Sequence, residues 1–302
     1  MSTFTRREVM QLALATGAVA LAPPIPASPS DKGMRLGLII HMGRDPEGAL
    51  AKVHNLGIPT CQAGISEYDA EMEKKLKAGI ERYGIEVTAI NTAGPGPAVW
   101  DFYKGPLTIG LVPREYRAQR VEHLKRASDF AKRCAVPALH THCGFIPENP
   151  NDPVYEETVK AIREVVSHCK GNGQLFLFET GQETPITLLR AIRDVGLDNQ
   201  GINLDVANLI LYGKANPVDA LEVIGPLVRG MHAKDGLYPT DPHKLGEEVP
   251  IGQGKVDFPR LFARLKELNY RGPVTIEREI EGPQQTEDVR KAKEYLEKLI
   301  AA

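Results

Sequence analysis

Short apolar runs alternate with longer amphipathic runs along the chain after residue 33. Each short run has the length of a buried β-strand. In the longer runs the apolar positions recur at three and four residues, which predicts helices that bury one face. The predicted strands are MRLGLII (34–40), IPTCQA (58–63), IEVTAIN (85–91), VPALHTH (136–142), QLFLFET (174–180), GINLDVA (201–207), RGMHAKD (229–235) and PVTIERE (273–279).

Eight strands that alternate with helices predict the fold of one large domain. The alternation occupies about 270 residues, the size of a (β/α)8 barrel. A doubly wound sheet is the alternative, but it normally carries a glycine-rich turn after its first strand. Here that stretch is HMGRDPEG. We therefore predict one α/β domain, a (β/α)8 TIM barrel over residues 34–302, with helix C-caps at Gly84, Gly171 and Gly196.

Four polar residues fall at corresponding positions of the last four strands. Glu179 and Asp205 lie on the fifth and sixth strands, and His232 and Glu277 on the seventh and eighth. The first two intervals are 26 and 27 residues, whereas the third is 45 residues. The excess predicts a long loop over residues 236–255, which we expect to cover the site. Because the C-terminal ends of barrel strands meet at one face, the four side chains should converge there.

The run QLFLFE is unusual, because an apolar strand that should be buried ends on the carboxylate of Glu179. A buried carboxylate is costly unless it is paired or bound to a metal. Two glutamates, one aspartate and one histidine form a ligand set for a hard or borderline divalent cation. The alternative for each residue alone is a salt bridge at a strand end. Four such residues in register on successive strands favour the metal site.

Several segments of the second half resemble a known family. They are FET, LDVANLILYG, MHAKDG, VPIGQGKVDFP and GPVTIERE, and they span residues 175–280. Together with the barrel pattern they make the chain similar to the sugar phosphate isomerase/epimerase family, the xylose-isomerase-like TIM barrels. The resemblance implies that Glu179, Asp205, His232 and Glu277 bind a Mn, Mg, Co or Zn ion.

The chain departs from the ketose 3-epimerases of that family at two positions. Those enzymes often carry a substrate-binding histidine three residues after the metal-binding aspartate, where this chain has Asn208. Their second glutamate, shortly after the first, has Glu183 as its nearest counterpart here. The implied substrate is a small carbohydrate, and we predict that Asn208 and Glu183 contact it.

Other residues near strand ends are candidates for substrate contact. His142 closes the fourth strand, where it could face the substrate, whereas His140 is predicted to be a hydrogen-bonded barrel residue. Lys234 either holds a substrate oxygen or pairs with a carboxylate. Asp235 is expected to cap the following turn. Trp100 either forms an apolar wall against a sugar face or simply packs.

A divalent ion at this position suits one type of chemistry. It can chelate two adjacent oxygens of a hydroxy-carbonyl compound and stabilise the enediolate that forms when the neighbouring C–H loses its proton. Glu179 or Glu277 can act as the base. His142 is the rival, because a neutral imidazole titrates near working pH. Return of the proton gives epimerisation or aldose–ketose isomerisation.

Three other functions match parts of the pattern. If a leaving group occupies the β-carbon, the same carbanion eliminates, and the protein is then a lyase or dehydratase acting on a keto-sugar or 3-keto-glycoside. A non-catalytic exported sugar-binding protein could keep the metal for its structure. A related apurinic endonuclease would need many more metal ligands and a basic surface. The chain has only eight histidines and a formal net charge of -2, which argue against it.

Composition changes this picture little. With 42% hydrophobic and 25% charged residues, the 302-residue chain is ordinary for a globular protein. The net charge of -2 also argues against a nucleic-acid partner. No two of the four cysteines have C-x-x-C spacing, so we expect buried free thiols rather than a zinc ribbon. The sequence leaves a homo-oligomer open.

The N-terminal segment resembles an export signal. Arg6 and Arg7 precede a short apolar run, residues 11–22, and a proline-rich stretch follows. A twin-arginine signal over residues 1–27 would send the folded, metal-loaded protein to the periplasm. The apolar run is too short to span a bilayer, so the mature protein should keep no stable membrane span.

Overall fold

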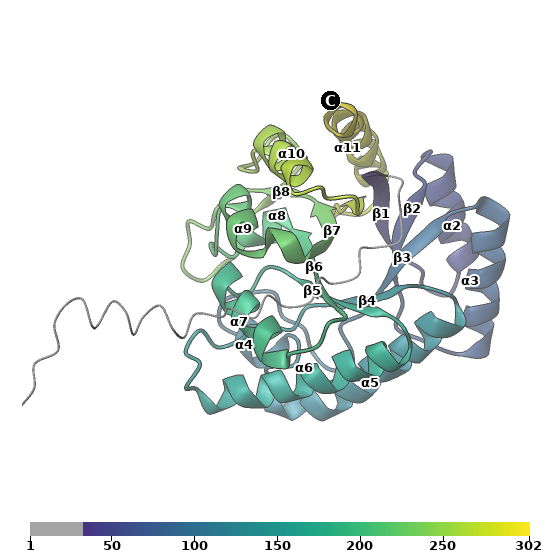
Figure 1. Cartoon of the computed structure of the whole chain (residues 1–302). Helices are drawn as coiled ribbons and strands as arrows, with labels where there is room; N and C mark the ends of the chain where they lie inside the picture. The colour runs from purple at the N-terminus through teal and green to yellow at the C-terminus, as the bar shows by residue number, and fades with distance from the viewer. Residues whose placement is uncertain (1–32) are drawn as a thin grey trace, which may run out of the picture.

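Eight parallel strands close into a barrel in the computed structural model, which describes residues 33–302 (Figure 1). The last strand pairs with the first in register from Arg35–Pro273 to Leu38–Ile276, which closes the ring. The predicted (β/α)8 barrel is therefore confirmed, and the doubly wound sheet is excluded. The barrel strands are β1 (Arg35–His41), β2 (Thr60–Gly64), β3 (Glu86–Asn91), β4 (Ala138–Thr141), β5 (Leu175–Glu179), β6 (Gln200–Asp205), β7 (Val228–Ala233) and β10 (Pro273–Ile276).

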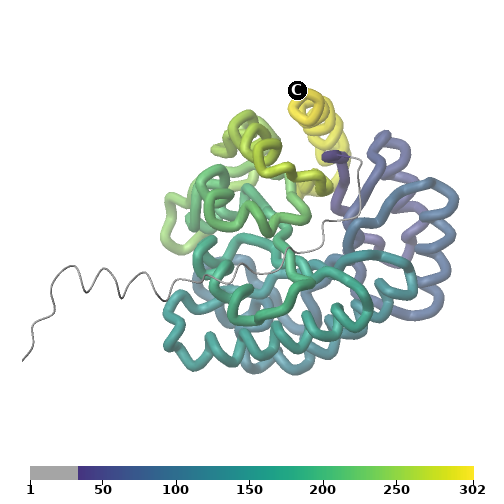
Figure 2. The backbone as a smooth tube through the Cα atoms, in the orientation of Figure 1, coloured from purple at the N-terminus to yellow at the C-terminus, as the bar shows by residue number. Residues whose placement is uncertain are grey.

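Helices cover the outside of this barrel. In Figure 2 the purple β1 lies beside the yellow last helix, so the two ends of the described chain meet. Apolar faces of the helices pack on the strands and form the core. The helices are α2 (Pro46–Asn55), α3 (Ala70–Tyr83), α4 (Gly105–Thr108), α5 (Arg114–Arg133), α6 (Pro153–Gly171), α7 (Pro185–Val195), α8 (Val206–Leu211), α9 (Pro217–Ile224), η1 (Gly225–Leu227), α10 (Phe258–Glu267) and α11 (Pro283–Ala301).

Glycine ends two helices as predicted. Gly84 and Gly196 follow α3 and α7 in the left-handed conformation, with φ of 64° and 68°, which glycine adopts without a Cβ clash. The third predicted cap is wrong, because Gly171 is the last helical residue of α6. Asn172 caps that helix, and Gly173, with φ of 74°, makes the left-handed turn instead.

Several predicted strands end earlier than the sequence pattern suggested, and two of these ends shape the site. The strand predicted over 201–207 stops at Asp205, because the Asp205 carboxylate accepts the Asn208 backbone N–H at 2.8 Å and so caps α8. The strand predicted over 273–279 stops at Ile276, so Glu277 lies just beyond its end. Both carboxylates thus stand at the rim of the barrel.

The predicted insertion lies where expected, between β7 and α10. It is not wholly irregular, since β8 (Asp235–Gly236) and β9 (Glu248–Val249) pair as a short antiparallel ribbon. All four cysteines are buried free thiols, as predicted.

A polar layer crosses the barrel interior below the rim. Gln62 on β2 donates its side-chain N–H to Asn203 on β6 at 2.8 Å, although these two strands are not neighbours. The bond therefore spans the barrel. His140 on β4 and His232 on β7 are fully buried in the same interior. Their rings lie edge to face, with centroids 5.2 Å apart.

The predicted signal, residues 1–27, lies outside the described residues. Among the helices of residues 33–302, none has the length and apolar character needed to cross a membrane.

Candidate functional site

The four predicted metal ligands converge at the C-terminal rim of the barrel. One ligand atom from each of Glu179, Asp205, His232 and Glu277 lies within 4.8 Å of the others. His232 Nδ1 is 3.1 Å from Glu179 Oε1 and 3.0 Å from Glu277 Oε2. The same atom is 3.6 Å from Asp205 Oδ2. The first three side chains are buried, and Glu277 is half-buried.

Gln62 fixes the orientation of the His232 ring. The Gln62 side-chain oxygen lies 2.7 Å from His232 Nε2. The Gln62 side-chain N–H already donates a hydrogen bond to Asn203 Oδ1, so only the oxygen is left to face the ring. His232 Nε2 must therefore carry a proton, and Nδ1 faces the three carboxylates. Although burial opposes it, Glu277 and Glu179 raise the pKa of this imidazole well above its usual value, and a bound cation would take the place of the Nδ1 proton. Such a hydrogen bond on the far nitrogen is what orients metal-binding histidines. Gln62 was not among the predicted site residues, although a polar residue within an apolar strand was a signal.

The charges of this cluster fit a divalent cation. Burial opposes ionisation of Glu179, but His142, His140 and His232 hold the pKa of that carboxyl well below its usual range. Burial raises the pKa of Asp205 to about 7, although Lys234 opposes this rise. One imidazole nitrogen and three carboxylates are a donor set for a hard or borderline ion. A bound cation would offset the cost of burying them.

Lys234 is a buried lysine whose ammonium group faces the carboxylates. Its Nζ lies 2.8 Å from Glu279 Oε1 and 3.2 Å from Glu277 Oε2. It is also 3.4 Å from Asp205 Oδ2 and 3.2 Å from Asn208 Oδ1. Burial disfavours its charge, but the carboxylates hold its pKa well above the usual value. Of the two predicted roles, pairing with carboxylates is the one the structure displays.

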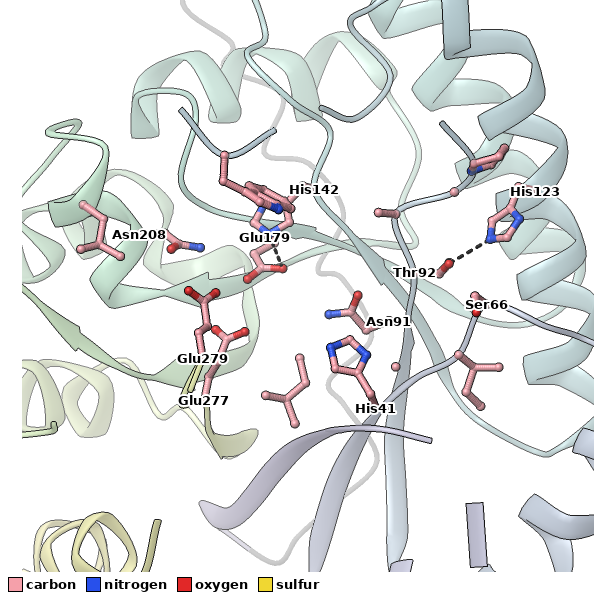
Figure 3. Close-up of a pocket in the computed structure, with 18 of the residues that line it drawn as sticks. His41, Ser66, Asn91, Thr92, His123, His142, Glu179, Asn208, Glu277 and Glu279 are labelled. Carbon is pink, nitrogen blue, oxygen red and sulfur yellow. Dashed lines mark hydrogen bonds and ion pairs between the residues drawn. The ribbon is translucent and has the colours of Figure 1, made fainter. Parts of the chain in front are cut away.

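An open cavity of about 890 Å³ lies over the cluster (Figure 3). Five of the predicted site residues line it, namely Glu179, Glu277, His142, Asn208 and Trp100. Asp205, His232, Lys234 and Glu183 are buried and are not among its lining residues. The cluster therefore forms the floor of the cavity, and only its glutamates reach the surface.

His142 stands at the cavity surface beside the first glutamate. Its Nε2 lies 3.0 Å from Glu179 Oε2, and its Nδ1 lies 3.2 Å from Gln182 Oε1. Burial lowers the pKa of His142, with Glu179 opposing, so the ring is neutral near pH 7. The Trp100 ring packs edge-on against it, with centroids 5.0 Å apart, and remains 46% exposed. The position of His142 suits either proton transfer or substrate binding.

Two further predicted residues have different surroundings. His140 was expected to be a barrel residue, and its Nε2 lies 2.8 Å from Glu179 Oε2. It forms a second group with metal-binding geometry together with Glu179 and His232. Glu183 is buried, and burial raises its pKa to about 8. It is therefore largely protonated at neutral pH.

Asp235 holds both ends of the loop over residues 236–255. Its carboxylate accepts the backbone N–H of Gly236, Gly252 and Gly254 at 2.9 Å each, and that of Val256 at 3.1 Å. The expected turn cap is confirmed and extends across the whole loop. From this loop Leu245 lines the cavity. Its neighbour His243 stacks on Tyr103, with ring centroids 4.7 Å apart.

We expect Asp235→Ala to loosen this loop. Four backbone donors lose a charged acceptor, and a hydrogen bond to a charged group contributes about 1.5–3 kcal/mol. The melting temperature should fall, and limited proteolysis should cut within residues 237–255. Asp241→Ala is the matched control, because Asp241 caps only the loop tip through the His243 N–H. Equal protease resistance of both variants would contradict this assignment.

Some residues of the site gave no clear sequence signal. Glu279 lines the cavity and contacts Lys234, but nothing in IERE distinguishes it from Glu277. On the opposite wall, Ser66 and Thr92 lie just after β2 and β3, and His123 lies on α5. The predicted site was drawn from strand ends and the segments that follow them, whereas His123 lies within helix α5.

The fold and the site together define a barrel protein with a carboxylate–imidazole centre under an open cavity. Residues 50–299 match the model of the xylose isomerase-like TIM barrel family. The chain belongs to that family, as the resemblance implied.

Several known proteins are similar to this chain. A solved xylose isomerase domain protein from Planctomyces limnophilus is 36% identical, with a TM-score of 0.84, and the match covers 88% of this chain and 97% of that one. A putative hydroxypyruvate isomerase from Homo sapiens is 25% identical over 69% of this chain and 75% of its own length. The L-ribulose-5-phosphate 3-epimerase UlaE of Shigella boydii is 24% identical over 74% and 78%. The uncharacterized protein MJ1311 of Methanocaldococcus jannaschii is 27% identical over 61% of this chain, and the match spans 63% of its length.

Proposed function

We propose that this protein is a divalent-metal-dependent sugar isomerase or epimerase. The observation that carries the proposal is the convergence of three carboxylates and one histidine under an open cavity. Family membership and relatives named as a sugar-phosphate epimerase and an isomerase support it. The substrate class is a small carbohydrate.

Each residue of the cluster has a distinct task in this function. Glu179, Asp205, His232 and Glu277 would hold the ion, which, when bound, supplies Lewis-acid polarisation of a substrate carbonyl. The buried members, Asp205 and His232, position the centre. Glu179 and Glu277 reach the cavity from β5 and from the end of β10. These two carboxylates can therefore meet substrate from different sides.

Proton transfer next to a carbonyl is the chemistry that this placement suits. Glu277 or Glu179 takes the proton from the acidic C–H, and the enediolate receives a proton again. Return to the same carbon on the opposite face gives epimerisation, and return to the neighbouring carbon gives isomerisation. His142, which contacts Glu179, can relay the proton or replace the glutamate as base.

The rival functions have less support. The lyase or dehydratase alternative would use the same proton abstraction, but the two relatives named by activity are an epimerase and an isomerase. A non-catalytic sugar-binding protein would use the same glutamates only as ligands, and turnover of a sugar distinguishes it from an enzyme. Export to the periplasm stays a prediction from Arg6 and Arg7.

Metal analysis combined with deuterium exchange tests the proposed function. The wild-type protein should carry one divalent ion and incorporate solvent deuterium into a ketose substrate. Asp205→Asn should keep the cap on α8, because an asparagine oxygen still accepts the Asn208 N–H. Loss of the negative ligand should weaken metal binding at least about 100-fold and remove exchange. Asp129→Asn, a change at the His168 ion pair on the outer helices, is the control. Full metal content in Asp205→Asn would refute the shared site.

A further inference from the structure

The cavity has two ends of different character (Figure 3). Glu179, Glu277 and His142 form the end over the proposed metal site. Ser66, Thr92 and His123 form the opposite end, and Asn91 and His41 lie between the two. The function proposed above uses only the first end, so the hydrogen-bonding groups at the other end are unexplained.

The distal wall is formed by side chains already held in place. His123 Nε2 lies 2.9 Å from both Thr92 Oγ1 and the Tyr68 hydroxyl oxygen. Tyr68 in turn donates its hydroxyl proton to the Ile65 carbonyl at 3.0 Å. Burial, aided by the charge of Arg126, lowers the pKa of His123. The wall is therefore pre-organised and uncharged, which suits hydroxyl groups.

The charges around the cavity disfavour an anionic ligand. Its lining includes three glutamates, Glu179, Glu277 and Glu279, and among its lining residues in the described part of the chain there is no lysine or arginine. Phosphate groups are usually bound by charged donors such as arginine or lysine. A phosphate at the distal wall would find only neutral donors there.

Three cationic side chains around the cavity already have partners. Lys234 contacts the carboxylates below the cavity. The buried guanidinium of Arg120 donates to the carbonyls of Pro95, Gly110 and Pro97 at 3.0, 2.7 and 2.8 Å. It therefore shapes the backbone of the cavity wall. In an adjoining hollow, Arg44 pairs with Glu67 at 3.4 Å.

We propose that the distal wall of Ser66, Thr92 and His123 binds the hydroxyl-bearing end of an unphosphorylated sugar. The inference rests on the proposed function, because it places the reacting carbonyl at the metal end. The cavity volume of about 890 Å³ lies near the top of the roughly 300–1,000 Å³ range for ligand sites. It can therefore hold a sugar that reaches from the metal end to the distal wall. The substrate is an uncharged keto sugar, not its phosphate ester.

Calorimetry with metal-saturated protein tests this selectivity. The probes are fructose, tagatose and ribulose, each compared with its own terminal phosphate ester. We expect at least one free sugar to bind at least about 30-fold more tightly than its ester, since the phosphate would meet only neutral donors at the distal wall. An ester that binds as tightly as its free sugar, or no binding of any free sugar, would overturn the proposal.

Substitutions in the wall provide a second measurement. Thr92→Val should weaken binding of the free sugar about 5-fold, because one hydrogen bond is lost. Thr88→Val is the matched control, since Thr88 lies on β3 just before Thr92, bonds the Cys61 carbonyl and does not line the cavity. Ser66 is exposed, so Ser66→Lys should fold normally and improve ester binding about 3- to 10-fold. Equal effects of Thr92→Val and Thr88→Val on sugar binding, or no gain of ester binding in Ser66→Lys, would refute the proposed binding of sugar at the distal wall.

These measurements separate the two proposals. If the binding preference and the Thr92→Val effect hold but no sugar exchanges deuterium, the proposed catalytic function is wrong and the neutral subsite stands. If exchange occurs but the esters react as well as the free sugars, the catalytic function stands and the subsite is wrong.

Discussion

Glu277→Gln is expected to lower solvent-proton exchange into the substrate at least about 1,000-fold. Glutamine has the same shape as glutamate but accepts no proton, and general acid–base catalysis contributes about 10²–10⁴-fold. Glu277 lines the cavity, and its Oε2 lies 3.0 Å from His232 Nδ1. The same substitution should therefore weaken metal binding as well. Exchange is measured by deuterium incorporation, and the metal by elemental analysis.

Two further variants decide which group is the base. A metal-bound carboxylate is a weaker base than a free one, so the glutamates must act on a C–H that the ion has made more acidic. His142→Asn should keep the metal, because His142 lies outside the four-ligand group. It should lose exchange only if the imidazole is the base. Exchange that persists in both Glu179→Gln and Glu277→Gln, with excess metal present, would exclude the glutamates.

Lys234→Met is expected to destabilise the metal-free protein by about 3–5 kcal/mol. Removing one partner of a buried ion pair leaves the other charges uncompensated. Here the Lys234 ammonium lies 2.8–3.4 Å from oxygens of Asp205, Asn208, Glu277 and Glu279. The melting temperature should fall by about 6–20 °C in a domain of this size.

A divalent ion should restore part of this loss. Because the proposed ion would bind the same carboxylates, saturating metal should raise the melting temperature of Lys234→Met more than that of the wild-type protein. Lys244→Met is the control, since its ammonium lies on the exposed loop, 3.9 Å from Asp241. Thermal unfolding with and without metal gives both values. An unchanged melting temperature in metal-free Lys234→Met would show that the cluster does not depend on this charge.

The fold could be predicted because its signals are local. Strand length, helical period and the glycine after α3 or α7 are properties of short segments. Eight repeats of strand and helix have the number and total length of a closed (β/α)8 barrel. Errors arose where a side chain ended an element. Asp205 caps α8 through its own carboxylate, so β6 stops two residues before the apolar run does.

The cluster of carboxylates and histidine could also be predicted, because a parallel barrel converts sequence spacing into spatial register. Residues one βα unit apart, such as Glu179 and Asp205, reach the same face whatever the helices between them contain. The position of Glu277 was predicted despite the long insertion, since the insertion lies in a loop and leaves the strand order unchanged.

Only the tertiary structure decided which side chains face one another across the barrel. Gln62 and His232 are separated by 170 residues and lie on strands that do not pair, yet their side chains meet at 2.7 Å. Lys234 faces the carboxylates, and His123 reaches the cavity from a helix. Periodicity reports which face of an element is buried, but not what lies opposite it. That depends on strand stagger, on the turn after each strand and on the rotamer of each side chain, which are set by packing of the whole domain.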